Sequence, residues 1–402
     1  MAGRSHRAGR HADGGRGLRA RADDQRQPAG RRDRGGRGRF RARRSGSRGQ
    51  RVGSGDRAGA GRIRRRRLSC DHGAAGGGSV HRARPCAPLR GHSPRPSGAA
   101  VTLAITGGTG FVGQALLDRL AAEGTGARVL ARTPPADRPG FEWIEGSLTD
   151  GFALEDLLKG AETVIHIAGL TSGTRPEHFQ IANAEGTFNI VKAAREAGVR
   201  RFVLVSSLAA REPELSAYGA SKRRAEKIVA SSDMEWTIVR PPGVYGPRDV
   251  DYLQMFRAAK WHVLPLPPAG RSSLIHVDDL ARLLIALIPR GEGARGEILE
   301  PDDGRKGGWT HGELAHAIGK ATGHWVVGLN LPRPLMELGA RLDLAMRGTQ
   351  ARLTPDRVGY LVHRDWVAAR ERAVPERLWT PEIATMSGLA ATARWYREQG
   401  WL

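Results

Sequence analysis

The sequence contains only two cysteines, Cys70 and Cys86, and both lie in its first hundred residues. Residues 101–402 therefore lack thiolates, which excludes a disulfide framework and a cysteine-ligated metal site from them. Long apolar runs are also missing, since no stretch reaches the roughly 18 residues that a membrane-spanning helix needs. The N-terminus lacks the apolar core of a secretory signal, so we expect a cytoplasmic location.

Charge is distributed unevenly along the chain. The 402 residues carry a formal net charge of +23. Residues 1–100 hold 27 arginines and six aspartates but no lysine or glutamate, so this segment alone carries +21. The remainder has 37 basic and 35 acidic side chains and is nearly neutral. Because the excess charge is confined to one segment, we do not expect nucleic acid to be a partner of the rest of the chain.

Residues 1–100 also have few large apolar side chains, and such a composition predicts disorder. The segment has three interpretations: a basic arm, an Arg-rich targeting peptide, or GC-rich upstream DNA translated together with the gene. The third accounts best for the abrupt change in composition at Val101. It predicts that the native chain begins at or near this residue.

A glycine-rich turn follows the first apolar run, residues 101–106. Gly107, Gly110 and Gly113 recur at intervals of three, and a helix-periodic stretch, residues 114–120, comes next. A strand, a tight turn and a helix in this order expose free N–H groups at the positive end of the helix dipole. This arrangement is typical of a pyrophosphate site.

Strands and helices alternate after this turn, which predicts a parallel α/β sheet covered on both faces. Further strands are expected at 128–131, 141–145, 163–167, 201–206 and 235–240, and helices at 153–158, 177–197 and 217–231. Residues 101–245 should form a doubly wound Rossmann core with ligands at the carboxyl ends of its strands. Residues 246–402 should form a smaller, mostly helical substrate cap interleaved with the core. Within it, Thr310 and Glu313 form a capping-box pattern before a helix.

Tyr218 and Lys222 lie four residues apart on an expected helix, so they share one face. A free phenol has a pKa of about 10, and a neighbouring ammonium group should lower it. The pair is therefore a candidate for proton transfer, with an ordinary exposed helix pair as the alternative. Ser207, at the end of a strand, can hydrogen-bond the substrate oxygen that Tyr218 protonates or deprotonates. We expect Ser206 to bond local backbone instead.

From Val101 onward, the sequence resembles the extended short-chain dehydrogenase/reductases of the NAD-dependent epimerase/dehydratase superfamily. The resemblance is weakest beyond Pro301. It is carried by the glycine turn, the Tyr-x-x-x-Lys pair, and segments 164–168, 183–190, 205–207, 240–247 and 276–280. It implies that Tyr218 is the general acid/base and that Lys222 activates it and binds a ribose hydroxyl. Ser207 would then donate to the substrate oxygen, Asn183 would support a proton relay, and a nicotinamide would carry the hydride.

The resemblance also implies a set of cofactor-binding residues. They are Gly107, Gly110, Phe111, Val112, Gly113, Arg132, Ser147, Leu148, Ala168, Gly169, Tyr218, Lys222, Pro241 and Val244. NAD enzymes usually place an acid after the second strand for the ribose 2′-hydroxyl, whereas this sequence has Arg132. A guanidinium fork suits a 2′-phosphate, so we favour NADP over NAD, with a solvated arginine as the alternative.

Two departures from the family pattern bear on the substrate. Residues 208–210 replace the Thr-Asp-Glu of sugar dehydratases. Gly243 stands where many nucleotide-sugar enzymes have an Asn that contacts the diphosphate. The sequence is thus more similar to the branch of 3β-hydroxysteroid dehydrogenases and dihydroflavonol reductases. We expect an NAD(P)-dependent oxidoreductase that acts on a secondary alcohol or ketone of a bulky, weakly charged molecule.

Two other functions are left open: a nucleotide-sugar epimerase that uses the same Tyr218, and a non-catalytic NAD(P)H-binding subunit or sensor. The intact set of Ser207, Tyr218 and Lys222 argues against the sensor. The segment 276–280 is interpreted as a structural turn, and no metal site is expected. Trp261 and Trp366 are expected to be packing residues. A homodimer is one assembly that the sequence permits.

Overall fold

A computed structural model describes residues 103–136, 138–289 and 293–402. The expectations about residues 1–100 and about a start at Val101 lie outside these residues. No helix within the described ranges is long and apolar enough to cross a bilayer.

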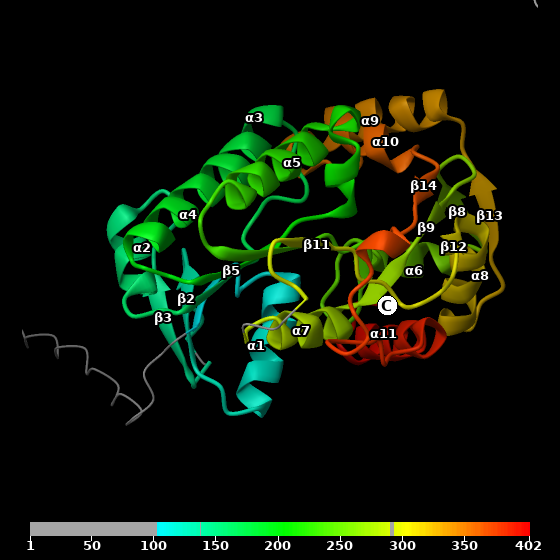
Figure 1. Cartoon of the computed structure of the whole chain (residues 1–402). Coiled ribbons are helices and arrows are strands. Elements are labelled where there is room, and N and C mark those ends of the chain that lie inside the picture. The colour runs from blue at the N-terminus through cyan, green and yellow to red at the C-terminus, as the bar shows by residue number, and fades with distance from the viewer. Residues whose placement is uncertain (1–102, 137, 290–292) are drawn as a thin grey trace, which may run out of the picture. The chain divides into compact units, whose positions relative to one another are not determined.

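A seven-stranded parallel sheet forms the centre of the fold, in the order β11-β6-β5-β4-β1-β2-β3 (Figure 1). Its strands are β1 (Leu103–Thr106), β2 (Ala127–Ala131), β3 (Phe141–Glu145), β4 (Thr163–His166), β5 (Arg201–Val205), β6 (Glu235–Val239) and β11 (Glu297–Leu299). The strand order reverses between β1 and β4, so the carboxyl ends of these strands form the topological switch point where ligands bind in such sheets. The expected doubly wound α/β architecture is confirmed.

Helices cover both faces of the sheet, because its strands are apolar on both sides. On one face α1 (Phe111–Ala122) and α7 (Val277–Ala286) pack against Ile105 and Val203. On the other face lie α2 (Gly151–Leu158), α4 (Gly186–Glu196) and α5 (Ala217–Ala230), which bury Leu157, Ile190 and Val229 with Phe202.

The long helix expected at 177–197 is interrupted. The chain forms α3 (Pro176–Phe179), a π-helical turn (Gln180–Glu185) and then α4. The π turn contains Asn183, whose side chain is paired with the backbone of Leu170. A π turn of this kind is often found at a functional site, and apolar periodicity does not predict it.

The C-terminal part is largely helical, as expected. It contains α6 (Leu253–Ala259), α8 (His311–Thr322), α9 (Arg333–Arg347), α10 (Pro355–Leu361) and α11 (Thr385–Glu398). The capping box before α8 is confirmed, because Thr310 Oγ1 accepts from Glu313 N at 3.1 Å and Glu313 Oε2 accepts from Thr310 N at 2.8 Å. Short 3₁₀ turns occupy Leu208–Arg211, Pro213–Leu215, Gly348–Gln350 and Arg370–Arg372.

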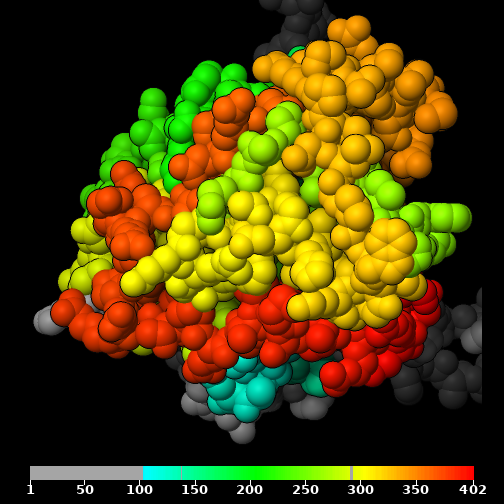
Figure 2. Space-filling model, turned by 90° about the vertical axis from the view of Figure 1, so that its right-hand side faces the viewer, coloured from blue at the N-terminus to red at the C-terminus, as the bar shows by residue number. Residues whose placement is uncertain are grey.

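Three small sheets accompany these helices, and the sequence analysis did not predict that strands would pair into sheets in this part of the chain. β7 (Gly243–Tyr245) pairs with β10 (Leu274–His276), and β8 (Val263–Leu266) pairs with β13 (Val327–Asn330). β9 (Arg271–Ser272) lies between β12 (Trp309–Thr310) and β14 (Asp365–Trp366). Seen from the side in Figure 2, the C-terminal elements form a continuous outer face, and α1 is visible below them.

Candidate active site

The glycine turn lies between β1 and α1, at the switch point of the sheet. Gly107 has a φ of +80°, a conformation that other residues rarely adopt, and a Cβ there would lie 2.5 Å from Ala168 N. A Cβ on Gly113 would overlap Gly107 O. The turn therefore needs glycine at both positions, because backbone segments meet there without room for side chains.

The first turn of α1 leaves donors available. Gly110 is its N-cap and supplies no side-chain cap. Within the described part of the chain, the N–H groups of Phe111, Val112 and Gly113 have no acceptor. Three free N–H groups at the positive end of a helix dipole fit a pyrophosphate, so the turn suits the dinucleotide that the sequence motifs imply.

The expected ribose and adenine contacts follow β2 and β3. Arg132 comes directly after β2, is exposed, and makes no ion pair with the described residues. Ser147 Oγ lies 2.9 Å from Thr149 Oγ1, and Leu148 is held by Asn189, whose Nδ2 donates to Leu148 O at 2.9 Å. Arg132 is thus available to an anion, whereas Ser147 and Leu148 already have partners within the protein.

Tyr218 is buried in the first turn of α5, with 8% of its surface exposed. Ser216 caps this helix by accepting from Gly219 N at 3.0 Å, and Asp356 of α10 accepts from Ala217 N at 2.5 Å. The Tyr218 ring lies 6.0 Å from the rings of Phe179 and Tyr360, measured between centroids. The surrounding apolar cluster, here called the Tyr218 cluster, comprises Leu170, Phe179, Ala209, Ala217, Tyr218, Tyr360 and Trp366.

Burial dominates the acidity of Tyr218. It raises the pKa of the phenol to about 12, although a hydrogen bond with the Ser207 side chain acts in the opposite direction. Lys222 does not contribute, so the expectation that Lys222 lowers the pKa of Tyr218 is wrong for the chain alone. The reason is geometric, because Lys222 Nζ donates to Val205 O at 3.0 Å instead of pointing at the phenol.

Lys222 and Asn183 lie next to the loop that follows β4. A Cβ on Gly169 would be 2.8 Å from Asn183 Oδ1 and 3.2 Å from Lys222 Nζ. Asn183 Oδ1 accepts from Leu170 N at 2.6 Å, and its Nδ2 donates to Ser221 Oγ at 2.8 Å. Burial lowers the pKa of Lys222 to about 8, while the Glu226 carboxylate raises it. The fold thus brings together Gly169, Asn183 and Lys222.

The two serines after β5 have different partners. Ser207 Oγ accepts from Ala209 N at 3.2 Å and is hydrogen-bonded to the Tyr218 phenol, so it lies at the oxygen that would meet a substrate. Ser206 Oγ donates to Glu226 Oε1 at 2.6 Å, so the expectation that Ser206 bonds local backbone is wrong for its side chain. Leu208 N donates to Pro241 O at 3.1 Å, which places Pro241 beside this loop, and Val244 packs against the core.

A buried hydrogen-bonded chain was missed by the sequence analysis. Thr106 Oγ1 lies 2.6 Å from His166 Nδ1, His166 Nε2 lies 3.0 Å from Thr187 Oγ1, and Thr187 Oγ1 donates to Asn183 O at 2.6 Å. Because Thr187 uses its proton on Asn183, His166 donates from Nε2 and accepts at Nδ1. Burial lowers the pKa of His166 to about 3, and the Lys222 charge acts in the same direction. The sequence did contain a signal for this chain, because Thr106 and His166 are polar residues at the ends of the apolar strands β1 and β4.

The C-terminal segment completes the Tyr218 cluster. Trp366 Nε1 donates to Tyr360 O at 2.9 Å, and the Arg211 guanidinium lies 5.7 Å from the Trp366 ring centroid. Trp366 is therefore a packing residue, as expected. A Cβ on Gly243 would overlap the hydroxyl of Tyr252, so the position of the nucleotide-sugar Asn is filled by a different side chain.

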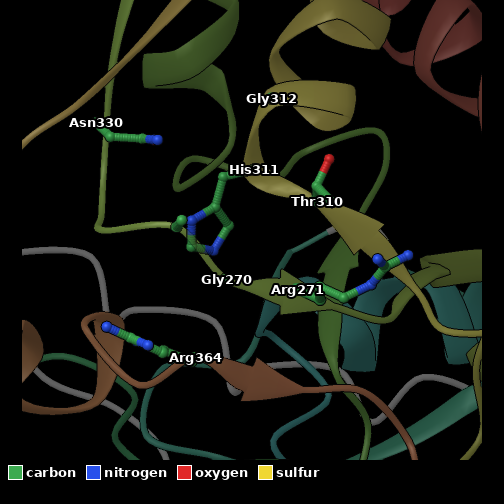
Figure 3. Close-up of a pocket in the computed structure, with 8 residues that line it drawn as sticks. Gly270, Arg271, Thr310, His311, Gly312, Asn330 and Arg364 are labelled. Carbon is green, nitrogen blue, oxygen red and sulfur yellow. The ribbon is translucent and has the colours of Figure 1, made fainter.

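A separate hollow of about 400 Å³ lies where β9, β14 and the start of α8 meet (Figure 3). It is lined by Ala269, Gly270, Arg271, Thr310, His311, Gly312, Asn330 and Arg364. None of the expected site residues lines it, so it is not the candidate active site. Across the described ranges no three His, Cys, Asp or Glu side chains group as a metal site. His276 instead caps α7, since its Nδ1 accepts from Asp278 N at 3.2 Å.

A glycine turn at the switch point of a parallel sheet, with a Tyr-Lys helix beside it, defines the class: a dinucleotide-binding α/β enzyme. Residues 103–300 match the family model described as NAD dependent epimerase/dehydratase family. A ceramide reductase of Caulobacter vibrioides is 38% identical over 316 residues, covering 75% of this chain and 96% of that protein. This chain belongs to the NAD-dependent epimerase/dehydratase family, and is an NAD-dependent oxidoreductase of that family.

Two further similarities add detail. A ketoreductase of Stigmatella aurantiaca, which acts on 4-hydroxy-2-methyl-3-oxo-4-farnesyl-3,4-dihydroquinoline-1-oxide, is 30% identical over 227 residues, covering 50% of this chain and 67% of that protein. The solved structure of MoeE5 with UDP-glucuronic acid and NAD has a TM-score of 0.57 at 22% identity. It covers 74% of this chain and 99% of MoeE5. At that identity the likeness supports the fold.

Proposed function

We propose that this chain is a reductase of ketones on lipid-like molecules, with Ser207, Tyr218 and Lys222 as its reacting site. The observation that carries the proposal is the setting of Tyr218: its phenol lies beside Ser207 within an aromatic and aliphatic cluster. Such surroundings favour an apolar substrate over a nucleotide sugar. The ceramide reductase and the farnesyl-quinoline ketoreductase among the relatives act on molecules of that kind.

The residues divide the chemistry between them. The reduced nicotinamide of a dinucleotide whose pyrophosphate is held at the glycine turn would supply the hydride. Ser207 donates a hydrogen bond to the carbonyl oxygen and orients the ketone. Tyr218 donates its proton to the same oxygen as negative charge develops on it. Burial keeps the Tyr218 phenol protonated at neutral pH, as donation to a ketone oxygen requires. Lys222 Nζ, which lies beside Gly169 and Val205 O, would bind a ribose hydroxyl of the cofactor.

The test is NADPH consumption by the purified full-length protein with the 3-keto form of a ceramide in mixed micelles. Tyr218→Phe should lower the rate by about a hundredfold or more, because it removes the general acid without changing the ring. Binding of NADPH, followed by its fluorescence, should be retained. A Tyr218→Phe variant as active as the wild type would contradict the proposal and favour the non-catalytic subunit.

The alternative of a nucleotide-sugar epimerase is tested in the same assay. An epimerase interconverts UDP-sugars without net consumption of NADPH, because the hydride returns to the same molecule. The Tyr252 hydroxyl beside Gly243 argues against this alternative. Turnover of UDP-glucose to a UDP-sugar epimer, with no turnover of the keto-lipid, would favour it.

We further propose NADP as the cofactor, on the basis of Arg132. This guanidinium is exposed after β2 and has no ion-pair partner among residues the structure describes, so it can form a bidentate pair with a 2′-phosphate. Arg132→Ala should weaken NADPH binding by about tenfold or more and leave NADH binding nearly unchanged. Arg138→Ala is the matched control, because Arg138 is already paired with Asp118. Equal losses for the two cofactors would contradict the proposal.

A further inference from the structure

Helix α9 has two apolar faces, and only one of them is covered. Met336 and Ala340 are buried against Val358 of α10. On the opposite side an exposed row follows the spacing i, i+3, i+7, i+11. It consists of Leu335 (52% exposed), Leu338 (52%), Leu342 (53%) and Met346 (76%). A helix that is apolar on a solvent-facing side has an unpartnered surface.

The outer side of the two-stranded sheet β8–β13 is a second exposed apolar surface. Val263 pairs with Val327, and Pro265 pairs with Leu329, so the outward residues of both strands are apolar. Val263, Val327 and Leu329 are 45%, 57% and 54% exposed. Two residues separate β13 from α9, and Figure 1 shows both at the same end of the molecule, far from α1 and β3.

Two tryptophans border the sheet. Trp261 is 72% exposed and Trp325 is 67% exposed. Trp325 stacks on His262 at 4.4 Å between ring centroids, and Lys260 lies 5.2 Å from the Trp261 ring centroid. The expectation that Trp261 is a packing residue is therefore wrong, because most of its ring faces solvent. We call the whole set the exposed apolar face: Trp261, Val263, Trp325, Val327, Leu329, Leu335, Leu338, Leu342 and Met346.

The charge around the exposed apolar face is positive. Residues 320–352 contain five basic side chains and two acidic ones. Both acids are engaged, Glu337 with Arg333 at 2.7 Å and Asp343 with Arg347 at 3.3 Å. Arg341 makes no ion pair with the residues that the structure describes, and it lies on the flank of the exposed row of α9. An apolar surface with tryptophans at its border and a basic flank matches the interface of an anionic bilayer.

We infer that the exposed apolar face attaches the protein to an anionic lipid bilayer, with α9 and the β8–β13 sheet lying in the interface. A second copy of the chain fits this face less well. In a two-fold dimer the same surface meets itself, which would place the arginines of one copy against those of the other.

Attachment would also bring the bilayer close to the Tyr218 cluster. Helix α10 packs on the covered side of α9 and carries Tyr360, whose ring lies 6.0 Å from that of Tyr218. Only α10 then separates a lipid that leaves the bilayer at α9 from the Tyr218 cluster. This link to the substrate rests on the proposed function, whereas the attachment itself does not.

The test uses the full-length protein and vesicles of phosphatidylcholine with phosphatidylglycerol whose acyl chains are brominated. Residues 1–100 carry +21 and can bind anionic vesicles by themselves, so sedimentation alone would not be decisive. Brominated chains quench tryptophan only at acyl-chain depth. We expect quenching in the wild type, and its loss when Trp261→Phe and Trp325→Phe are combined.

A variant set separates the exposed apolar face from the rest of the surface. Leu335→Glu, Leu338→Glu and Leu342→Glu together should abolish the quenching. Phe152→Glu is the matched control, since Phe152 is 82% exposed on α2, and it should behave as the wild type. Arg341→Ala should raise the concentration of anionic lipid needed for half-maximal quenching by about fivefold. Circular dichroism and NADPH oxidation with a detergent-solubilised ketone check that the variants are folded.

Three results would overturn the inference. The first is no quenching in the wild type, and the second is equal quenching in the triple Leu→Glu variant. The third is a wild-type dimer, seen by light scattering, that the triple substitution dissociates while no quenching is observed. The quenching experiment tests membrane attachment independently of the proposed reductase activity. Failure of attachment leaves reduction of the solubilised ketone intact, and failure of the reductase proposal leaves the quenching intact.

Discussion

Tyr218, Lys222 and His166 are all buried, and burial shifts the pKa of each toward its neutral form. The pKa of Tyr218 rises to about 12, that of Lys222 falls to about 8, and that of His166 falls to about 3. At neutral pH the phenol and the imidazole are therefore uncharged. The ammonium of Lys222 loses its proton far more readily than an exposed lysine.

His166 makes stability depend on pH in the acid range. The unfolded chain protonates this histidine below about pH 6.5, whereas the folded chain keeps it neutral down to about pH 3. Acid therefore favours unfolding between these values, and stability should fall by up to about 1.4 kcal/mol per pH unit. His166→Gln should reduce that slope in urea unfolding measured from pH 7 to pH 4. His316→Gln, at an exposed position on α8, is the control, and an unchanged slope in His166→Gln would contradict the assignment.

At the scale of elements, the glycine turn, the parallel strands and the Tyr-Lys helix could be predicted from local patterns. Their residues carry apolar periodicity, turn glycines and helix caps within one short window. The π turn at Asn183 and the strands β7, β9, β12 and β14 could not be predicted. Their hydrogen-bond partners are distant in sequence, and strands of two or three residues are too short to show an alternation of apolar and polar residues. Phe179, Tyr360 and Trp366 were missed as neighbours of Tyr218 for the same reason.

The contact between α10 and α5 gives a prediction at this scale. Asp356 accepts from Ala217 N in the first turn of α5, where a negative charge also favours the helix dipole. Asp356→Asn should cost about 1 kcal/mol in stability and lower kcat more than it changes KM, because Tyr218 is held by that turn. Thermal unfolding and steady-state kinetics measure the two effects. The exposed Asp156→Asn on α2 is the control, and an unchanged kcat for Asp356→Asn would contradict the positioning role.

At the scale of the whole molecule, a buried charge network joins the core to the C-terminal segment. Glu226 is paired with Arg240 at 2.7 Å, and Arg240 is paired with Glu300 at 3.3 Å. Glu300 also accepts from Arg211 at 3.4 Å and from Ala369 N at 2.9 Å. The network begins at Ser206, next to Ser207, so one set of ion pairs fixes both the serine loop and the chain that covers Tyr218.

Breaking this network should be costly. Glu300→Gln leaves Arg240 and Arg211 with one negative partner fewer in a dry environment, and we expect a loss of about 3 kcal/mol in the free energy of unfolding. Glu337→Gln removes an exposed ion pair of α9 and should cost less than about 1 kcal/mol. Denaturant unfolding of both variants measures the difference. Similar losses for the two would show that the buried network does not stabilise the fold.

The late position of Tyr360 and Trp366 in the sequence has a consequence for synthesis on the ribosome. A growing chain acquires the glycine turn, Ser207, Tyr218 and Lys222 well before it acquires the two residues that pack on Tyr218. Until α10 and β14 have emerged, water reaches the phenol on the side that those elements later occupy. The raised pKa of Tyr218 is therefore reached only when the C-terminal segment folds back, so a stalled or truncated product would keep the motif without the burial that raises this pKa.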